Sequence, residues 1–376
     1  MNRFLQLHLL TNFPPANLNR DDTGRPKTAL MGDALRLRVS SQCEKRAWRT
    51  SDVFREALSA SPPSGRARSE ARTIVQWEDQ PHPHLGTRTK EAGVQIYQAL
   101  IARDVKEKDA KTWAASMAEQ FGKLQKEKKD APLNDLRIEQ LCHLGPEERA
   151  AVDALVATCA ERRGAPTEAE LKLLRRPQAA VDIAMFGRML ADHPSHNVEA
   201  AVQVAHAVTV HKAAVEDDYF SAVDDLNRDD KGAGHIGERG YGAGLFYQYI
   251  CVNRELLAEN LGGDEALSKR ALGALLHAVT KVAPTGMQNS HASRAYASYV
   301  LAEQGNQQPR SLVQAFLRPV KPYDEQDDML SLAVKAIERR VENFDQVYGA
   351  CAELRYTLNV EQAKGRLDEL IAFAQG

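Results

Sequence analysis

The sequence predicts an α+β fold, in which a core of strands and helices is interrupted by two long excursions. Apolar and polar residues alternate at 35–40, and 354–360 is also strand-like, so strands are expected near both ends of the chain. Residues 90–176 are instead rich in Ala, Lys, Glu and Leu, which is typical of helices. A chain of 376 residues is longer than a single core usually grows, which favours one main domain with insertions.

The joint between the strand at 35–40 and the helix after it is the most informative local feature. Ser41 fits a helix N-cap, and Glu44 three residues later completes a capping box. Lys45 and Arg49, four residues apart, share one face of the helix. Unpaired amide groups, the helix dipole and two cations meet there, which suits a phosphodiester. The same cations would also fit an ordinary solvated surface.

The remaining elements follow from periodicity and composition, and the helical lobe interrupts a domain that begins at the N-terminus. In chain order we expect a strand at 3–10, a loop at 12–32, breaks at 61–66 and 80–84, a helical lobe at 90–176, a strand at 179–186, a helical or irregular excursion at 198–230, a glycine-rich segment at 232–244 leading to a strand at 245–252, a helix at 263–282, a polar turn at 284–290, a strand at 354–360 and a helix at 361–374.

Charge is unevenly distributed along the chain. The net charge is only −2, so a site for a polyanion has to arise from local segregation. Residues 1–72 contain 13 Lys or Arg against 7 acids, a net charge of +6, which leaves −8 for the rest. The sequence therefore allows a basic surface for a polyanion and an acidic one for neighbouring protein.

Several classes of site are not indicated. The five cysteines are far apart and lack C-x-x-C spacing, and the histidines are scattered, so we expect no disulfide framework, metal site or cofactor. The glycines at 232–244 match no nucleotide-binding loop, because they precede a strand. No signal peptide or long apolar span is evident, so we expect a soluble, cytoplasmic protein without membrane contact.

A set of motifs in fixed order carries a family resemblance. The motifs are Leu-Asn-Arg-Asp-Asp at 18–22, Arg-Val-Ser-Ser-Gln at 38–42, Asp-Ile-Ala-Met-Phe-Gly-Arg-Met at 182–189, the stretches 197–207, 215–226 and 232–237, and Pro-Thr-Gly-Met-Gln-Asn-Ser at 284–290. With these motifs the chain resembles the CasC family, the backbone subunits ("Cas seven" family, RAMP superfamily) of the type I-E CRISPR surveillance complex, Cascade. The resemblance covers nearly the whole chain and is weakest across 60–175.

The resemblance implies a hand-shaped molecule that binds CRISPR RNA without catalysing a reaction. An RRM-like, ferredoxin-like palm would use 1–59, 177–200 and 235–376, with helical fingers inserted at 60–176 and a thumb at 201–234. Family members polymerise head to tail along the guide and present it to a complementary target DNA strand. The implied partners are CRISPR RNA, the target DNA strand, further copies of the chain and other Cascade subunits.

The resemblance also implies which residues contact RNA. The start of the basic helix would hold the guide backbone, Lys27 lies in the matching loop, and Met185 takes the place of an apolar side chain that packs against RNA. The polar turn at 284–290 belongs to the same surface. The complete set of expected RNA-binding residues is Lys27, Ser40, Gln42, Lys45, Arg46, Arg49, Met185, Val208, Thr209, Lys212, Gln288 and Asn289.

A second interpretation stays open. Related RNA-targeting CRISPR backbone subunits are metal-dependent endoribonucleases that use an aspartate in the loop after the first strand. Asp21, Asp22 and Asp33 are the candidate residues for this alternative. The order of the motifs matches the DNA-targeting class, which favours a scaffold over a nuclease.

Overall fold

The computed structural model describes residues 2–59, 77, 81–176, 178–222, 235–322, 324 and 327–376. They form two compact units, the first from 1–59, 203–254 and 272–376 and the second from 60–202 and 255–271. The expected break at 61–66 and the tip of the expected thumb, 223–234, lie outside the described residues. The palm, fingers and thumb boundaries remain predictions.

The first unit is built on a nine-stranded sheet whose described pairings are antiparallel. The main strand order is β11-β10-β1-β9-β7-β3-β2, and β6 and β8 also pair with β9. The strands are β1 (Phe4–Ala16), β2 (Thr28–Met31), β3 (Ala34–Val39), β6 (Val202–Val204), β7 (Ala207–Thr209), β8 (Glu216–Ala222), β9 (His235–Asn253), β10 (Ala297–Gly305) and β11 (Leu354–Asn359). The α+β prediction is confirmed, and the ferredoxin-like detail remains a prediction.

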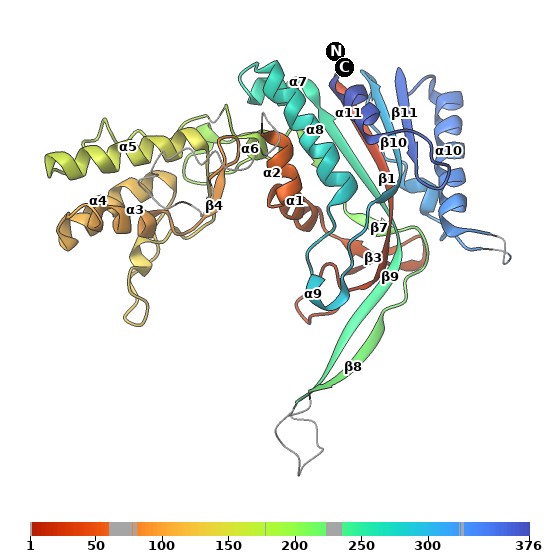
Figure 1. Ribbon diagram of the computed structural model, residues 1–376, viewed down its shortest axis with the longest axis horizontal. Coiled ribbons are helices and arrows are strands. Elements are labelled where there is room, and N and C mark those ends of the chain that lie inside the picture. Colours follow the sequence, from red (N-terminus) through yellow and green to blue (C-terminus); the bar gives the residue numbers. More distant parts are fainter. Residues whose placement is uncertain are drawn as a thin grey trace, which may run out of the picture. The chain divides into compact units, whose positions relative to one another are not determined.

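Helices cover both faces of this sheet (Figure 1). On one face, α10 (Met329–Tyr348) and the 3-10 turn η4 (Val313–Phe316) bury apolar residues against β9 and β10, including Tyr247 and Tyr299. On the other face, Phe13, Leu37 and Phe246 form a second core near the end of α8 (Glu265–Lys281). The C-terminal helix α11 (Leu367–Gln375) contacts β10 and β11. Because both faces of β1 are buried, apolar residues are frequent throughout the first half of this strand.

The predicted helix after β3 is present, but it is capped one residue earlier than expected. Helix α1 spans Ser41–Arg49, and Ser40 is its N-cap, whose hydroxyl accepts a hydrogen bond from the Cys43 amide. Glu44 is consequently too far along to complete a capping box and is buried instead. A second short helix, α2 (Asp52–Leu58), follows with Ser51 as its cap, so the apolar face continues across two helices.

Four other expectations about secondary structure are wrong in part. The loop at 12–32 contains the end of β1 and all of β2. Residues 179–186 form a helix, α6 (Val181–Phe186), and not a strand. The excursion at 198–230 contains the short strands β6, β7 and β8. The helix predicted at 361–374 begins only at Leu367, because Gly365 adopts a positive φ of 75° that turns the chain before it.

The described part of the glycine-rich segment is itself strand, at the start of β9. Together, β8 and β9 run out from the sheet as a two-stranded arm (Figure 1). Side chains crowd these glycines: a Cβ on Gly237 would lie 2.3 Å from the Phe220 ring, and one on Gly242 would lie 2.8 Å from Leu37. The glycines therefore let β9 pack closely against Phe220 of β8 and Leu37 of β3.

The second unit is mainly helical, as the composition of 90–176 predicts. Its helices are α3 (Ala92–Ile101), α4 (Glu107–Ala118), α5 (Pro146–Arg162), α6 and most of α7 (Arg254–Asn260), joined by the 3-10 turns η1 (Glu119–Phe121), η2 (Asn134–Leu136) and η3 (Pro194–His196) and a small sheet of β4 (Thr87–Thr89) and β5 (Cys142–Leu144). A buried ion pair between Arg188 and Glu148, 2.7 Å apart, holds the segment after α6 against the start of α5. The unit has its own apolar core around Trp113 and Leu144.

A buried charge network ties four strands of the first unit together, β1, β9, β10 and β11. Glu303 on β10 is fully buried and accepts hydrogen bonds from Arg310 and Arg355, at 2.8 Å each. Its other neighbour is His8 on β1, 3.2 Å away, whose second ring nitrogen lies 2.9 Å from the Tyr247 hydroxyl of β9. Such a network stabilises the fold only while every member is present.

All five cysteines are free thiols. Among the described residues, no helix is both long and apolar enough to cross a membrane.

Candidate nucleic-acid interface

The joint between β3 and α1 is held by the loop that carries Lys27. The side-chain oxygen of Asn19 accepts a hydrogen bond from the Ser40 amide at 2.9 Å, and its backbone oxygen accepts one from the Lys27 amide at 2.8 Å. The Lys27 carbonyl in turn accepts from the Arg38 amide. These bonds place Lys27 beside the start of α1, where unpaired amides and the helix dipole favour an anion.

Helix α1 separates a buried face from a polar one. Glu44, Ala47 and Trp48 are buried, whereas Gln42 and Arg46 are exposed. Lys45 and Arg49 are half-buried, and burial lowers the pKa of Lys45. The described surface of the helix is therefore polar and basic, as the sequence predicts.

The Cys43 thiol shows that Lys27 and Arg46 lie close to the same point. Burial raises the pKa of Cys43 to about 11, and the positive charges of Lys27 and Arg46 act against that rise. Electrostatic effects of this kind act over short distances. Lys27 from the loop and Arg46 from α1 are thus both close enough to Cys43 to act on its thiol.

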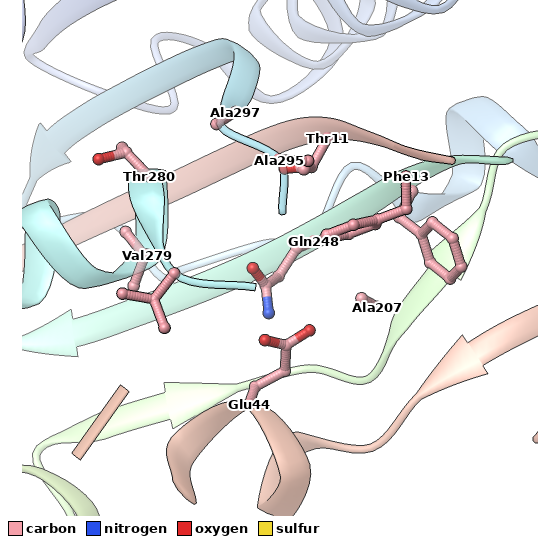
Figure 2. A pocket seen from close by; sticks show the side chains of 11 residues that line it. Thr11, Phe13, Glu44, Ala207, Gln248, Val279, Thr280, Ala295 and Ala297 are labelled. Carbon is pink, nitrogen blue, oxygen red and sulfur yellow. The ribbon is translucent and has the colours of Figure 1, made fainter. Parts of the chain in front are cut away.

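Beneath this turn, Glu44 faces Gln248 of β9 in a small pocket (Figure 2). Burial raises the pKa of Glu44 to about 8. The carboxyl is consequently mostly protonated at neutral pH and places little negative charge under the basic surface. The pocket, about 10 Å³ in volume, has room for roughly one water.

Two further basic side chains meet at the neighbouring strand pair β3–β7. Arg38 of β3 pairs with Val208 of β7, and its guanidinium lies 2.8 Å from Nδ1 of His206, just before β7. Burial together with Arg38 and Lys27 lowers the pKa of His206. Lys27, Arg38 and His206 therefore form one cationic cluster beside α1.

The polar turn at 284–290 packs against the same loop. A Cβ on Gly286 would lie 2.3 Å from the Leu18 carbonyl oxygen, so the backbones are in close contact there. The turn leads into the short helix α9 (Gln288–His291), in which Gln288 is half-buried and Asn289 is exposed. The structure thus brings α9 into the neighbourhood of the Lys27 loop.

The expected residues at the base of the thumb differ in exposure. Val208 and Thr209 are buried in β7, and the Thr209 hydroxyl accepts from the Leu37 amide and donates to the His211 carbonyl. Lys212, by contrast, is exposed. Of the three, only Lys212 presents its side chain to solvent.

Met185 lies in the second unit. It is fully buried in α6, which Asp182 holds in place by accepting hydrogen bonds from Gly86 and His143. Its expected contact with RNA stays a prediction.

Two of the three aspartates of the alternative interpretation lie in turns of the chain. Asp21 accepts hydrogen bonds from the Thr23 amide and hydroxyl and from the Arg25 amide, which lowers its pKa and braces the loop. Asp33 occupies the turn between β2 and β3 with a positive φ of 58°. Among the described residues, no three His, Cys, Asp or Glu side chains gather into a metal site.

Sequence reasoning missed three residues of this interface: Asn19, Arg38 and His206. Arg38 is a polar residue of the alternating strand pattern. The available signal was its position two residues before Ser40, the N-cap of α1. His206 lies 168 positions away from Arg38, so only the pairing of β3 with β7 brings the two together.

The comparisons with known proteins agree with the motifs. The family model described as CT1975-like protein matches residues 5–373. The structure is similar to a chain of a "CRISPR RNA-guided surveillance complex, pre-nicking", with a TM-score of 0.79 and 28% identity over 99% of this chain and 100% of that one. A chain of a "CRISPR RNA-guided surveillance complex" shares the fold at a TM-score of 0.70 and 24% identity, covering 98% and 99% of the two chains. No curated protein matches. Since the family model spans almost its whole length, the chain belongs to the CT1975-like protein family.

Proposed function

We propose that this chain is a non-catalytic backbone subunit of a CRISPR surveillance complex of type I-E, and that it binds CRISPR RNA along the surface formed by α1, the Lys27 loop and the β3–β7 pair. The observation that carries the proposal is that the hydrogen bonds of Asn19 hold Lys27 beside the N-terminus of α1, whose exposed face carries Arg46. Such a surface binds phosphates and leaves the bases free to pair.

The similarity to chains of CRISPR RNA-guided surveillance complexes supports the same role. In this proposal further copies of the chain line up along the guide, other Cascade subunits complete the complex, and a target DNA strand pairs with the exposed guide bases. Sequence specificity then lies in base pairing, and the protein recognises the backbone.

The proposal is tested by purifying the complex from its host and sequencing the RNA that it carries. The expected result is a population of spacer sequences flanked by repeat sequence. Recovery of bulk cellular RNA without repeats would argue against the proposal.

A scaffold has no cleavage activity that depends on the loop aspartates. Changing Asp21, Asp22 and Asp33 together to Asn should therefore leave the behaviour of the assembled complex unchanged, apart from a small loss of stability through Asp21. The assay incubates the complex with a divalent metal and RNA complementary to the guide. Regularly spaced cuts in the wild-type reaction that disappear in the triple variant would favour the endoribonuclease.

The two-stranded arm should matter for assembly more than for folding. Residues 218–239 contain six Asp or Glu against three Lys or Arg, so the arm suits a basic protein surface better than RNA. Asp217 and Gly240 are partners in register, so a two-residue Asn-Gly turn can replace 218–239 and leave β7 intact.

We expect this variant to fold and to bind RNA a few-fold more weakly, but to lose the regular assembly of copies along the guide. Circular dichroism checks folding, and nuclease footprinting of the guide checks assembly. A footprint with the wild-type period would show that the arm is not needed. A matched control, Lys364→Gln on the loop after β11, should keep the period.

A further inference from the structure

The contact between Arg38 and His206 fixes the state of the imidazole ring. An arginine side chain only donates hydrogen bonds, so Nδ1 of His206, 2.8 Å from Nη1 of Arg38, has to accept one and carries no proton. In the neutral ring the proton is therefore on Nε2, which is free to donate to a ligand. The ring is exposed.

Arg38 is itself fixed in position. Its Nε donates to the Thr28 carbonyl at 3.4 Å, and its amide donates to the Lys27 carbonyl at 2.8 Å. No ion pair found in the described part of the chain uses Lys27, Arg38 or His206. The cluster thus presents two cations and a neutral imidazole to solvent without a carboxylate to balance them.

We propose that Lys27, Arg38 and His206 form a seat for one phosphate group of RNA, and that His206 takes up a proton when the phosphate binds. This inference rests on the proposed function. It adds His206 to the RNA-binding surface and couples RNA binding to the uptake of a proton. In the free protein, Lys27 and Arg38 disfavour a third positive charge. A bound phosphate supplies the negative charge that reverses this balance. The proton taken up goes to Nδ1, so Nη1 of Arg38 leaves that nitrogen and donates to the phosphate instead, while Nε2 of the ring donates to the same phosphate.

The remaining titratable groups at this joint do not account for such an effect. On α1, burial raises the pKa of Cys43 to about 11, so the thiol stays protonated, and it raises the pKa of Glu44 to about 8. On β9, Tyr249 lies next to the segment that carries His206, because its backbone carbonyl accepts a hydrogen bond from the Ala205 amide. Burial raises the pKa of the Tyr249 phenol, so this group stays protonated across the pH range of the experiment. Glu44 needs a control, and so do two further histidines of the first unit, His211 and His291, whose changes to Asn should each keep the uptake.

Binding of RNA and binding of a proton to His206 are linked, so the affinity for RNA depends on pH. Because the bound form holds more protons, affinity for RNA should rise as the pH falls, by up to about tenfold per pH unit for a single proton. We expect about a tenfold gain between pH 7.5 and pH 5.5. The gain should arise between the pKa of the bound ring and that of the free ring, and it should level off once the free ring, whose pKa lies below the ordinary 6.5, is itself protonated.

The experiment measures binding of an oligouridine RNA to the full chain by fluorescence anisotropy at constant ionic strength across this pH range. Oligouridine is suitable because its bases do not titrate there. Calorimetry at pH 6.5 in two buffers of different ionisation enthalpy then counts the protons taken up. Wild type should take up a fraction of one proton per subunit and bind more tightly in acid.

Three variants separate the outcomes. His206→Asn should take up no proton and lose the gain in acid, whereas His206→Lys should bind tightly at every pH because its charge is permanent. Glu44→Gln should keep the uptake by His206. If wild type binds RNA without proton uptake, or if His206→Asn still shows uptake, the inference is wrong and the proposed function stands. If wild type binds no RNA at any of these pH values, the proposed function fails with it.

Discussion

Replacing Glu303 with Gln should lower the free energy of unfolding by about 3 kcal/mol or more, because it leaves buried charges without their partner. Glu303 is fully buried, and it accepts from Arg310, of which 13% is exposed, and from Arg355, of which 32% is exposed. The neutral amide cannot balance either guanidinium, and its NH₂ group would face donors. Urea denaturation of both proteins measures the loss. Glu361→Gln, on the exposed loop after β11, is the matched control and should change stability little.

The same network predicts how stability depends on pH. Hydrogen bonds from His8 and Arg310 hold the pKa of Glu303 far below its ordinary value despite burial, so stability is lost as pH falls below about 4.5, where the unfolded chain takes up the proton first. Burial lowers the pKa of His8, and stability therefore begins to fall below 6.5 for the same reason. Wild type should lose stability in both ranges. The Gln variant should lose less stability in the lower range, because the contribution of Glu303 is missing while carboxyls such as Glu170 and Asp345 still contribute. An unchanged acid profile would contradict this account of the network.

The parts of the fold that the sequence predicted well are those set by local chemistry. The alternation at 35–40 and the serine pair that precedes α1 are local signals, and the structure shows β3 and α1 there, with the cap displaced by one residue. The helix α8 likewise follows from its own periodicity. In these segments the residue propensities, the hydrophobic pattern and the capping residues agree. The local sequence is therefore enough to predict the secondary structure.

The errors occur where distant contacts decide the conformation. Val181 and Ile183 suggest a strand, yet Asp182 accepts hydrogen bonds from the amides of Gly86 and Ile183 and so fixes a helical turn. Strands β6 and β7 have only three residues each, too few for a period to be visible, and they form by pairing with β9.

The candidate site divides in the same way. The basic first turn of α1 could be predicted, because its cap and its cations are adjacent in sequence. The cluster of Lys27, Arg38 and His206 could not, because it depends on the pairing of β3 with β7 and on the bond from Lys27 to Asn19. Thr209 was expected at the RNA surface, and its burial follows from the position of β7 inside the sheet.

Removing the cations around α1 should weaken RNA binding by the largest factor of any change to the surface. Lys27 lies beside the start of the helix, Arg46 is exposed on it, and Lys45 and Arg49 lie half-buried along it. Each double change to Gln, of the first pair or of the second, should cost about 30-fold in affinity at moderate salt, and all four together about 1,000-fold. Gln keeps much of the length of both side chains, so their packing against the helix is largely retained.

The salt dependence identifies the cause of this loss. If the four side chains neutralise phosphates, the slope of log affinity against log salt should shrink by about 0.7 per lost contact on single-stranded RNA. The loss should be equal for any RNA sequence, because phosphate contacts carry no sequence information. Lys335→Gln with Arg339→Gln, on exposed positions of α10, changes the net charge by the same amount and should leave affinity nearly unchanged. If this control loses as much affinity as either pair, or if the site variants keep the wild-type slope, RNA binds elsewhere on the chain.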